Sequence, residues 1–230
     1  MHQRTHTYNK ERKTFMETSL PYNFIVVEGN IGAGKTTLCR LLSEDFDYRL
    51  ILEEFADNPF LPHFYKNPER YAFPVELFFM TERHKQLQAE LSQRNLFQQS
   101  IIADYIFVKT LLFARNNLME EEYRLFQRLF NILNATFPKP DLLVYLHRSV
   151  DNLMENIRKR GRSYEQEIAP EYLQQIQTAY FDFFKASDHI PILIIDIEQV
   201  DFLQHREYYE KILDVLRKPY HPGVHRVRVF

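Results

Sequence analysis

The sequence predicts an α/β fold in which a five-stranded parallel β-sheet carries helices on both faces. Two observations lead to this class. Five short segments are apolar throughout rather than alternating, which indicates strands buried on both sides. Longer segments of helical pattern separate them, and this order is typical of a parallel sheet. The strands are expected at residues 23–28, 50–55, 100–104, 141–146 and 191–197.

The helices follow from the spacing of apolar residues. The first is expected at residues 35–46, where Leu38, Leu41 and Leu42 share one face. A long helical pattern at 68–94 contains Pro74, which can break a helix. A further pattern runs from the third strand to about residue 133, with a break expected near Asn117. The last three helices are expected at residues 150–159, 171–186 and 207–216.

The composition limits the kind of function. The chain has 230 residues, of which 45% are apolar and 26% charged, and the formal net charge is −2. This ordinary globular mixture has no block of like charge, so a small-molecule substrate is favoured over a nucleic acid polymer. Residues 21–217 are expected to form one domain, preceded by a mobile arm (1–20) and followed by a tail (218–230).

Cysteine usage and hydropathy suggest the compartment. The single cysteine, Cys39, cannot form an internal disulfide and is expected to be a packing residue of the first helix. No apolar run approaches the roughly 18 residues that a membrane helix needs. Residues 1–15 also lack the apolar core of a signal peptide. A cytoplasmic protein without membrane contact is therefore expected.

A phosphate-binding loop is the most specific motif. Residues 29–36 read GNIGAGKT, which matches G-x-x-x-x-G-K-[ST] between an apolar strand and a helix. Backbone N–H groups of such a loop surround phosphate oxygens, Lys35 supplies a positive charge, and Thr36 supplies a hard oxygen for Mg²⁺. Three of the five glycines lie here. The residues expected to bind ATP are Gly29, Asn30, Ile31, Gly32, Ala33, Gly34, Lys35, Thr36 and Thr37.

A basic segment follows the fourth strand. Residues 158–162 read RKRGR between two expected helices. Such a run by itself is most often a solvated turn. Beside a phosphate-binding loop, however, a glycine-hinged arginine segment can close over ATP and neutralise the charge of a transferring phosphoryl group. Arg160 and Arg162 are the expected catalytic arginines of this lid.

Three carboxylates lie where strands end. Glu53 and Glu54 end the second strand, and Asp104 ends the third. Ligands of doubly wound sheets bind outside these ends, where phosphoryl transfer needs a base for the acceptor and an acidic partner for Mg²⁺. Asp104 is expected to serve the metal with Thr36, and a helix N-cap is its structural alternative. Because strand side chains alternate, one of Glu53 and Glu54 points into the site, and periodicity leaves open which.

Five segments in order resemble those of a known family. They are EGNIGAGKTTL (28–38), EEFADNPF (53–60), FYKNPERYAF (64–73), ADYIFVKTLLFA (103–114) and RKRGRSYEQEI (158–168). Residues 22–217 thereby resemble the cellular deoxynucleoside kinases, including bacterial deoxyguanosine and deoxyadenosine kinases. The resemblance implies transfer of phosphate from ATP·Mg²⁺ to the 5′-hydroxyl of a deoxynucleoside, a reaction of nucleotide salvage.

The resemblance also implies roles for single residues. The spacing to the Asn-Pro pair that follows places Glu53 at the family's general base. Tyr65 falls on the tyrosine that contacts the sugar 3′-hydroxyl, and Glu165 on the lid glutamate that also touches the sugar. The segment EQVDF, which ends in Asp201 and Phe202, resembles the loop whose backbone holds the adenine of ATP.

Two departures from the family pattern concern the acceptor site. Asp104 falls on the acid of the family's [DE]-R-S motif, but Tyr105 follows it, so the arginine beside the base is missing. Some bacterial purine-directed members also read D-Y here. The family's base-reading glutamine is replaced by Glu76.

The second departure bears on the nucleobase. Glu76 and Arg83 lie two helical turns apart on one face, where a surface ion pair is the alternative to a ligand site. An ionised carboxylate only accepts hydrogen bonds, so Glu76 suits the N1–H and 2-amino groups of guanine. Arg83 can donate to guanine O6 or N7. Purine deoxynucleosides are expected to be preferred, deoxyguanosine before deoxyadenosine, and a protonated Glu76 or an ordered water would admit adenine.

Two other functions stay open. A nucleoside monophosphate kinase needs a cationic clamp for the substrate phosphate, for which Arg83 is the evident candidate. A catalytically silent subunit of an assembly would be expected to lose Lys35, the base or the lid arginines, and all are present.

The region after the third strand is rich in aromatic residues. They offer more apolar surface than one sheet face covers, with ordinary core as the alternative. Since the family usually dimerises through helices, a symmetric homodimer is expected. The residues concerned are Phe107, Phe113, Phe126 and Phe130.

Overall fold

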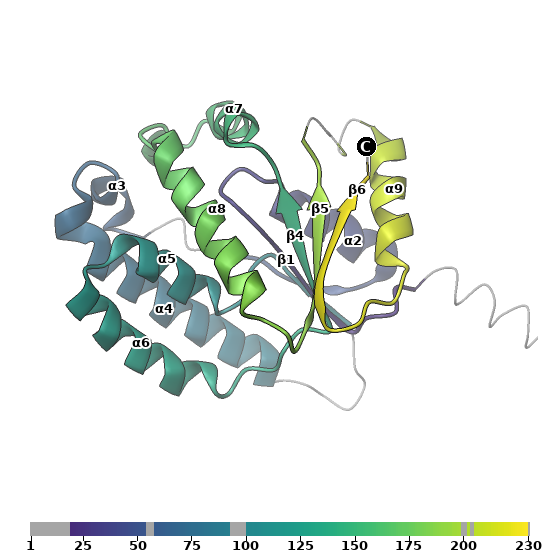
Figure 1. Ribbon diagram of the computed structural model, residues 1–230, viewed down its shortest axis with the longest axis horizontal. Helices are drawn as coiled ribbons and strands as arrows, with labels where there is room; N and C mark the ends of the chain where they lie inside the picture. Colours follow the sequence, from purple (N-terminus) through teal and green to yellow (C-terminus); the bar gives the residue numbers. More distant parts are fainter. Residues whose placement is uncertain (1–18, 54–57, 93–99, 199–201, 203–204, 230) are drawn as a thin grey trace, which may run out of the picture.

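In the described part of the chain, a six-stranded parallel β-sheet forms the centre of the protein (Figure 1). The computed structural model describes residues 19–53, 58–92, 100–198, 202 and 205–229. The strand order is β2-β3-β1-β4-β5-β6, and every neighbouring pair is parallel. The strands are β1 (Phe24–Gly29), β2 (Arg49–Ile51), β3 (Ile101–Ala103), β4 (Leu142–His147), β5 (Pro191–Asp196) and β6 (Gly223–Arg228).

The prediction of five strands is wrong, because β6 adds a sixth. It lies in residues 218–230, which the sequence assigned to a tail, and it pairs with β5 from Pro191 opposite Gly223 to Asp196 opposite Arg228. Its side chains alternate between half-buried and exposed, as suits a strand at the edge of a sheet. A search for continuously apolar segments therefore passes over it. The expected arm at residues 1–20 lies almost wholly outside the described residues.

Helices cover both faces of the sheet (Figure 1). Because side chains alternate along β1, Ile25 and Val27 pack toward α2 and α9, whereas Phe24 and Val26 pack toward α4, α5 and α6. α8 covers β4 and β5 on the second face. The helices are α2 (Lys35–Phe46), α3 (Leu61–Phe64), α4 (Pro68–Ser92), α5 (Lys109–Asn117), α6 (Glu120–Asn134), α7 (Val150–Arg160), α8 (Pro170–Lys185) and α9 (Arg206–Leu216).

The helices lie close to where the sequence predicted them. α4 continues through Pro74, while the predicted break near Asn117 separates α5 from α6. Cys39 is buried in α2, as expected of a packing residue. The short α3 and the 3₁₀ turn Ser163–Glu165 were not predicted, since one turn is too short to show a helical period. Among the described residues, no helix combines the length and apolar character that crossing a membrane requires.

The aromatic residues after β3 belong to the interior. Phe107, Phe126 and Phe130 are buried, and the rings of Phe107 and Phe130 stack with centroids 5.1 Å apart. These three therefore supply no surplus apolar surface, contrary to the expectation from the sequence, whereas Phe113 is half-buried and lines a cavity described below. Different side chains of the same region are exposed: Met119, Leu125, Leu129 and Ile132.

Candidate active site

The loop between β1 and α2 has the geometry that its motif predicts. Gly32 has a φ of +82°, and a Cβ there would lie 2.9 Å from a carbonyl oxygen of α7, so only glycine fits. The Asn30 side chain donates to a carbonyl of α8 at 2.8 Å, which anchors the loop. α2 begins directly at Lys35, so the unpaired N–H groups of its first turn are available to an anion.

Lys35 is folded back onto this loop. Its Nζ donates to the carbonyls of Gly29 and Asn30 at 2.9 and 3.0 Å. Burial lowers the pKa of Lys35 to about 8, and repulsion from the nearby Lys109 ammonium adds to this effect. Phosphate oxygens placed in the loop would compete with the carbonyls and favour the charged form of Lys35.

Asp104 directly follows β3 and joins the loop to the chain after β2, which ends at Ile51 and not at residue 55 as the sequence predicted, so that Glu53 lies beyond the strand. Its Oδ2 accepts from the Thr36 hydroxyl at 2.5 Å, and its Oδ1 accepts from the Glu53 backbone N–H at 2.8 Å. It does not cap a helix, since the N-cap of α5 is Val108. Among the described residues there is no cluster of three or more His, Cys, Asp or Glu that could hold a metal. Mg²⁺ beside a nucleotide needs only one or two protein oxygens, so Thr36 and Asp104 fit it.

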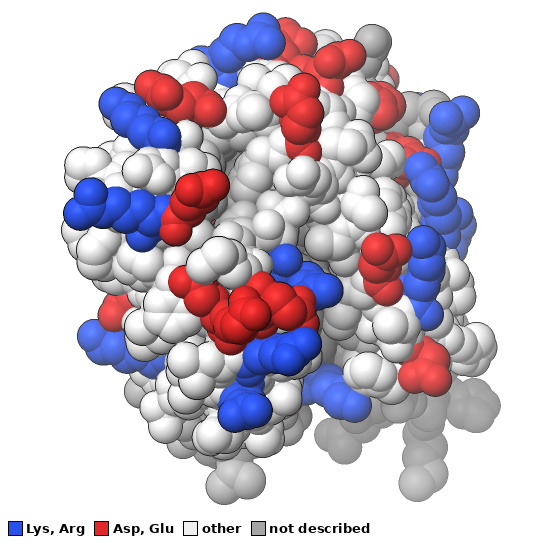
Figure 2. Space-filling model, turned by 60° about the vertical axis from the view of Figure 1, so that its left-hand side comes forward, with Lys and Arg blue, Asp and Glu red and all other residues white. Residues whose placement is uncertain are grey.

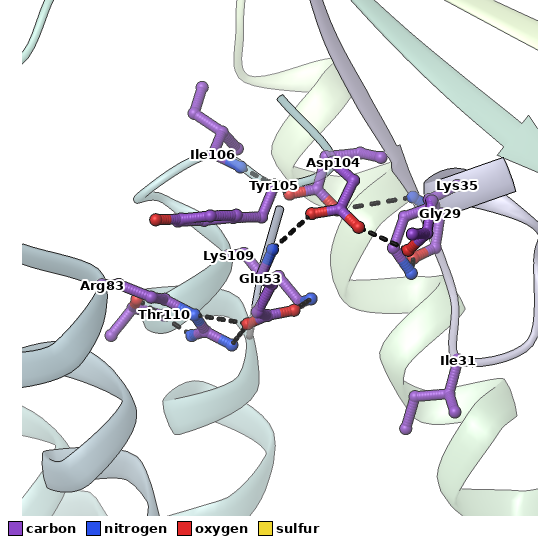
Figure 3. A network of polar contacts seen from close by, with 12 residues as sticks. Gly29, Ile31, Lys35, Glu53, Arg83, Asp104, Tyr105, Ile106, Lys109 and Thr110 are labelled. Atoms are coloured by element: carbon purple, nitrogen blue, oxygen red, sulfur yellow. Dashed lines mark hydrogen bonds and ion pairs between the residues drawn. The ribbon is translucent and has the colours of Figure 1, made fainter. Parts of the chain in front are cut away.

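Glu53 is clamped between two cations (Figure 3). Its Oε1 accepts from Arg83 Nε at 2.8 Å and Nη2 at 2.6 Å, and its Oε2 accepts from Lys109 Nζ at 2.5 Å. Burial opposes ionisation, but Arg83 and then Lys109 hold the pKa of Glu53 well below its usual range. Glu53 is therefore an ionised carboxylate facing the ligand cavity. Glu54, its alternative, lies outside the described residues.

Lys109 is a site residue that the sequence analysis missed. It is buried at the start of α5, and no motif spacing links it to Glu53. The one available signal was a lysine inside the apolar segment FVKTLLFA. Arg83 lies elsewhere than expected, because its guanidinium faces Glu53 and also donates to the Thr110 hydroxyl at 3.0 Å.

Two neighbouring cavities lined by described residues meet at the phosphate loop. The first contains Glu53 and Glu76, and the second contains Phe202 and Thr37. Residues of the loop and of the arginine segment line both cavities: Gly32, Lys35, Thr36, Arg160 and Arg162. Ile31 lines the first, and Ala33 and Gly34 line the second. On the face shown in Figure 2, acidic and basic side chains are interspersed rather than gathered into a basic stripe.

Glu76 lies in the first cavity with half of its carboxylate unpaired. It is 2% exposed, and its Oε1 accepts from Asn117 Nδ2 at 2.6 Å. Its buried Oε2 has no hydrogen-bond partner among the described residues. Burial raises the pKa of Glu76 to about 7, although Arg83 and Asn117 oppose the rise. The alternative of a surface ion pair is excluded, because Arg83 is 3% exposed and bonded to Glu53.

Two arginines of the segment RKRGR, Arg160 and Arg162, line both cavities and bond to Glu165. Glu165 Oε2 accepts from Arg160 Nε at 3.0 Å, and Glu165 Oε1 accepts from Arg162 Nη1 at 3.3 Å. Gly161 ends α7 with a φ of +71° and turns the chain between the two arginines. Tyr65 lines the same cavity, and burial followed by repulsion from Glu165 raises the pKa of its hydroxyl.

Glu198 and Phe202, which follow β5, line the second cavity. Phe202 is buried, and a Cβ on Gly34 would lie 3.2 Å from its ring. Asp201 lies outside the described residues. Arg148, which the sequence analysis did not single out, also lines this cavity and donates from Nη1 to the Glu198 carbonyl at 2.6 Å.

A doubly wound α/β sheet with ligand cavities at the carboxyl end of its central strand defines the class, an α/β protein that binds its ligands at this edge of the sheet. Comparison with known proteins gives the family, since the family model described as "Deoxynucleoside kinase" matches residues 25–219. The chain belongs to the deoxynucleoside kinase family, whose members phosphorylate deoxynucleosides.

Individual relatives agree with this assignment. The chain is 35% identical over 193 residues to the deoxyguanosine kinase of Bacillus subtilis (strain 168), covering 82% of this chain and 93% of that protein. It is 30% identical over 210 residues to the deoxyadenosine/deoxycytidine kinase of the same organism, covering 89% and 97%. The structure of deoxyadenosine kinase from M. mycoides with bound dCTP matches with a TM-score of 0.70 at 25% identity, covering 83% and 98%. The family resemblance stated from the sequence is confirmed.

The raised pKa of Glu76 makes stability depend on pH. The pKa of Glu76 is about 7 in the folded protein and near 4.5 in the unfolded chain, so the folded state binds the proton more tightly. The stability that protonated Glu76 contributes is therefore fully present below about pH 4.5 and is lost as the pH rises through about 7. Glu76→Gln is neutral at every pH. Between pH 4.5 and 8.5 the wild type should therefore lose about 3 kcal/mol of unfolding free energy relative to Glu76→Gln. Urea unfolding of both proteins at each pH measures this difference. Glu69→Gln, exposed on the same helix, is the control, and parallel pH curves for Glu76→Gln and wild type would contradict the assignment.

Proposed function

We propose that this protein transfers the γ-phosphoryl group of ATP·Mg²⁺ to the 5′-hydroxyl of a purine deoxynucleoside, in nucleotide salvage in the cytoplasm. The observation that carries the proposal is that two cavities meet at Lys35, one of them holding the ionised Glu53. Relatives named deoxyguanosine kinase and deoxyadenosine kinase support a purine acceptor. An assay of ADP release with the four deoxynucleosides tests the reaction directly.

The donor side is assigned to the second cavity. The loop N–H groups and Lys35 would bind the β- and γ-phosphates, while Phe202 and the backbone around Asp201 would hold the adenine. Thr36 and Asp104 would hold Mg²⁺, which when bound neutralises charge on the phosphate oxygens. Arg160 and Arg162 line both cavities and can turn from Glu165 to the transferring phosphoryl group.

The acceptor side is assigned to the first cavity. Glu53 holds the 5′-hydroxyl and receives its proton. A carboxylate with a depressed pKa is a weak base. In a loose transition state, however, the hydroxyl becomes acidic as its bond to phosphorus forms, so that a weak base can then take its proton. Tyr65 and Glu165 line the cavity where the sugar would lie, and Glu76 lies where the nucleobase edge would be read.

The contacts of Arg83 favour an unphosphorylated acceptor. A nucleoside monophosphate kinase would use this residue as a clamp for the substrate phosphate. Here its guanidinium is bonded to Glu53 and Thr110, and that carboxylate would repel a phosphate. A catalytically silent subunit is likewise disfavoured, because Lys35, Glu53 and both lid arginines line the first cavity.

Replacement of Lys35 tests the donor side. Lys35→Ala removes a charge whose interaction with phosphate oxygens strengthens in the transition state, so kcat should fall by on the order of 10² or more. Lys185→Ala, exposed on α8, serves as the control in the same ADP-release assay. Turnover of Lys35→Ala within a few-fold of wild type would contradict the assignment of the loop.

Replacement of Glu53 tests the base. Glu53→Gln keeps the size of the side chain but cannot take a proton, so kcat should fall by about 10²–10⁴-fold while deoxynucleoside binding is largely retained. Glu54→Gln is the matched control and should have a mild effect. The reverse order of the two losses would show that the wrong carboxylate has been assigned.

The nucleobase preference should depend on pH. Arg83, Lys109 and Glu53 are the charged groups that act on Glu76, and Asn117 donates to it. Ionised Glu76 accepts from guanine N1–H and the 2-amino group, whereas protonated Glu76 can donate to adenine N1.

Deoxyguanosine should be the best substrate at pH 8, then deoxyadenosine, then the pyrimidines. The ratio of kcat/KM for deoxyguanosine to that for deoxyadenosine should fall as pH drops below about 7, and this trend should disappear in Glu76→Gln. A pyrimidine as best substrate would refute the purine preference.

The exposed apolar residues of α6 support a symmetric homodimer. These residues share one face of the helix, because successive members are four and three positions apart: Leu125, Leu129 and Ile132. Light scattering at micromolar concentration should give twice the chain mass of 27.9 kDa. The double variant Leu125→Glu/Ile132→Glu should be monomeric and folded, and a monomeric wild type would refute the dimer.

A further inference from the structure

Lys109 lies between the acceptor base and the phosphate loop. It is 6% exposed, at the start of α5, and its aliphatic stem leads to an ammonium 5.6 Å from the centre of the Phe113 ring. The ammonium bonds to Glu53 and is close enough to Lys35 to depress the pKa of that lysine. A buried lysine costs stability unless its charge is compensated, and here Glu53 compensates it.

The contacts of Glu53 are unequal at its two oxygens. Both N–H groups from Arg83 reach Oε1, so Arg83 alone would leave the carboxylate able to turn about that one oxygen. Lys109 bonds to Oε2 and removes this freedom (Figure 3). A carboxylate oxygen accepts about two hydrogen bonds. Arg83 therefore fills Oε1, and one acceptor position is left on Oε2, beside Lys109, for a substrate hydroxyl.

Tyr105 does not supply a cation here. It stands where the family motif has an arginine, and its side chain is fully buried with the hydroxyl donating to Gln86 Oε1 at 2.5 Å. The Tyr105 hydroxyl is thus bonded to α4, and a phenol carries no positive charge. Besides Arg83, Lys109 is the described basic residue that bonds to the Glu53 carboxylate.

We propose that Lys109 is the positioning residue that orients Glu53 toward the acceptor hydroxyl, in place of the arginine that the motif lacks. In the step, which rests on the proposed function, the bond between the γ-phosphorus of ATP and the oxygen that bridges it to the β-phosphorus breaks, and that oxygen leaves as part of ADP. A bond from the 5′-oxygen to the γ-phosphorus forms, and the hydroxyl proton passes to Glu53 Oε2. Lys109 keeps its own proton throughout. The products are ADP and the deoxynucleoside 5′-monophosphate.

The test compares Lys109→Met with Lys109→Arg, using Lys185→Met on the exposed face of α8 as the matched control. Misplacement of a catalytic group costs about 10²-fold. Lys109→Met should therefore lower kcat by about that factor, while KM for ATP and for deoxyguanosine stays within about three-fold of wild type. Lys109→Arg should recover at least about ten-fold of the loss. Each variant is checked for folding by calorimetric ATP binding and by a cooperative thermal transition. If Lys109→Met does not fold, Lys109→Gln is used in its place.

A double variant separates positioning from a merely structural role. If Lys109 acts through Glu53, Glu53→Gln/Lys109→Met should be no more than about three-fold slower than Glu53→Gln, because residues that act as a unit are not additive. Losses that multiply, an unchanged kcat in Lys109→Met, or a loss confined to KM for ATP would each overturn the inference.

Wild-type turnover is measured first. If no deoxynucleoside causes ADP release, the proposed function is refuted. If wild type and Lys109→Met both turn over normally, only the role of Lys109 is refuted.

Discussion

The two halves of the site are joined by the carboxylate of Asp104. One oxygen accepts from the Thr36 hydroxyl in the phosphate loop, and the other accepts from the backbone N–H of Glu53, two residues beyond the end of β2. This is possible because β3 lies between β1 and β2 in the sheet, so a residue at its end reaches the ends of both neighbours. One side chain thereby sets the distance between the phosphate loop and the carboxylate opposite it. A transfer reaction depends on such fixed separation, since small displacements of reacting groups cost large factors in rate.

The parts of the site that lie close together in sequence could be predicted, and the parts assembled from distant segments could not. The phosphate loop and the arginine segment each occupy a few consecutive residues, so local spacing carries their geometry. The contact between Lys109 and Glu53 joins residues 56 positions apart in different elements. No period or motif connects them, and the choice of Glu53 over Glu54 itself depended on a family resemblance rather than on strand periodicity.

Apolar pattern has a similar limit in the fold. It located β1, β3, β4 and β5 because these strands are largely buried, but it placed the second strand at 50–55 where β2 spans Arg49–Ile51, and it missed β6, whose half-exposed sequence GVHRVR alternates. In α6 it could not separate interior from surface, since Phe126 and Leu125 are both apolar and adjacent. The hundred-degree step between neighbouring helix positions places the first in the core and leaves the second 51% exposed. Which side chain is buried depends on how the helix is rotated about its axis relative to the sheet, and this rotation is set by tertiary packing.

Two of the carboxylates that line the first cavity have opposite pKa shifts. Glu53 contacts two cations and is ionised, whereas Glu76 contacts an amide, and burial raises its pKa to about 7. The difference comes from the planar fork of Arg83, which bonds to Glu53 but acts on Glu76 only through its charge. Positive charge is therefore concentrated at the end of the cavity nearest the phosphate loop. The other end holds a carboxylate with one unpaired oxygen. A ligand edge with two adjacent donors would supply the hydrogen bonds that Glu76 lacks, and its binding would lower the pKa of that carboxyl and release a proton at neutral pH.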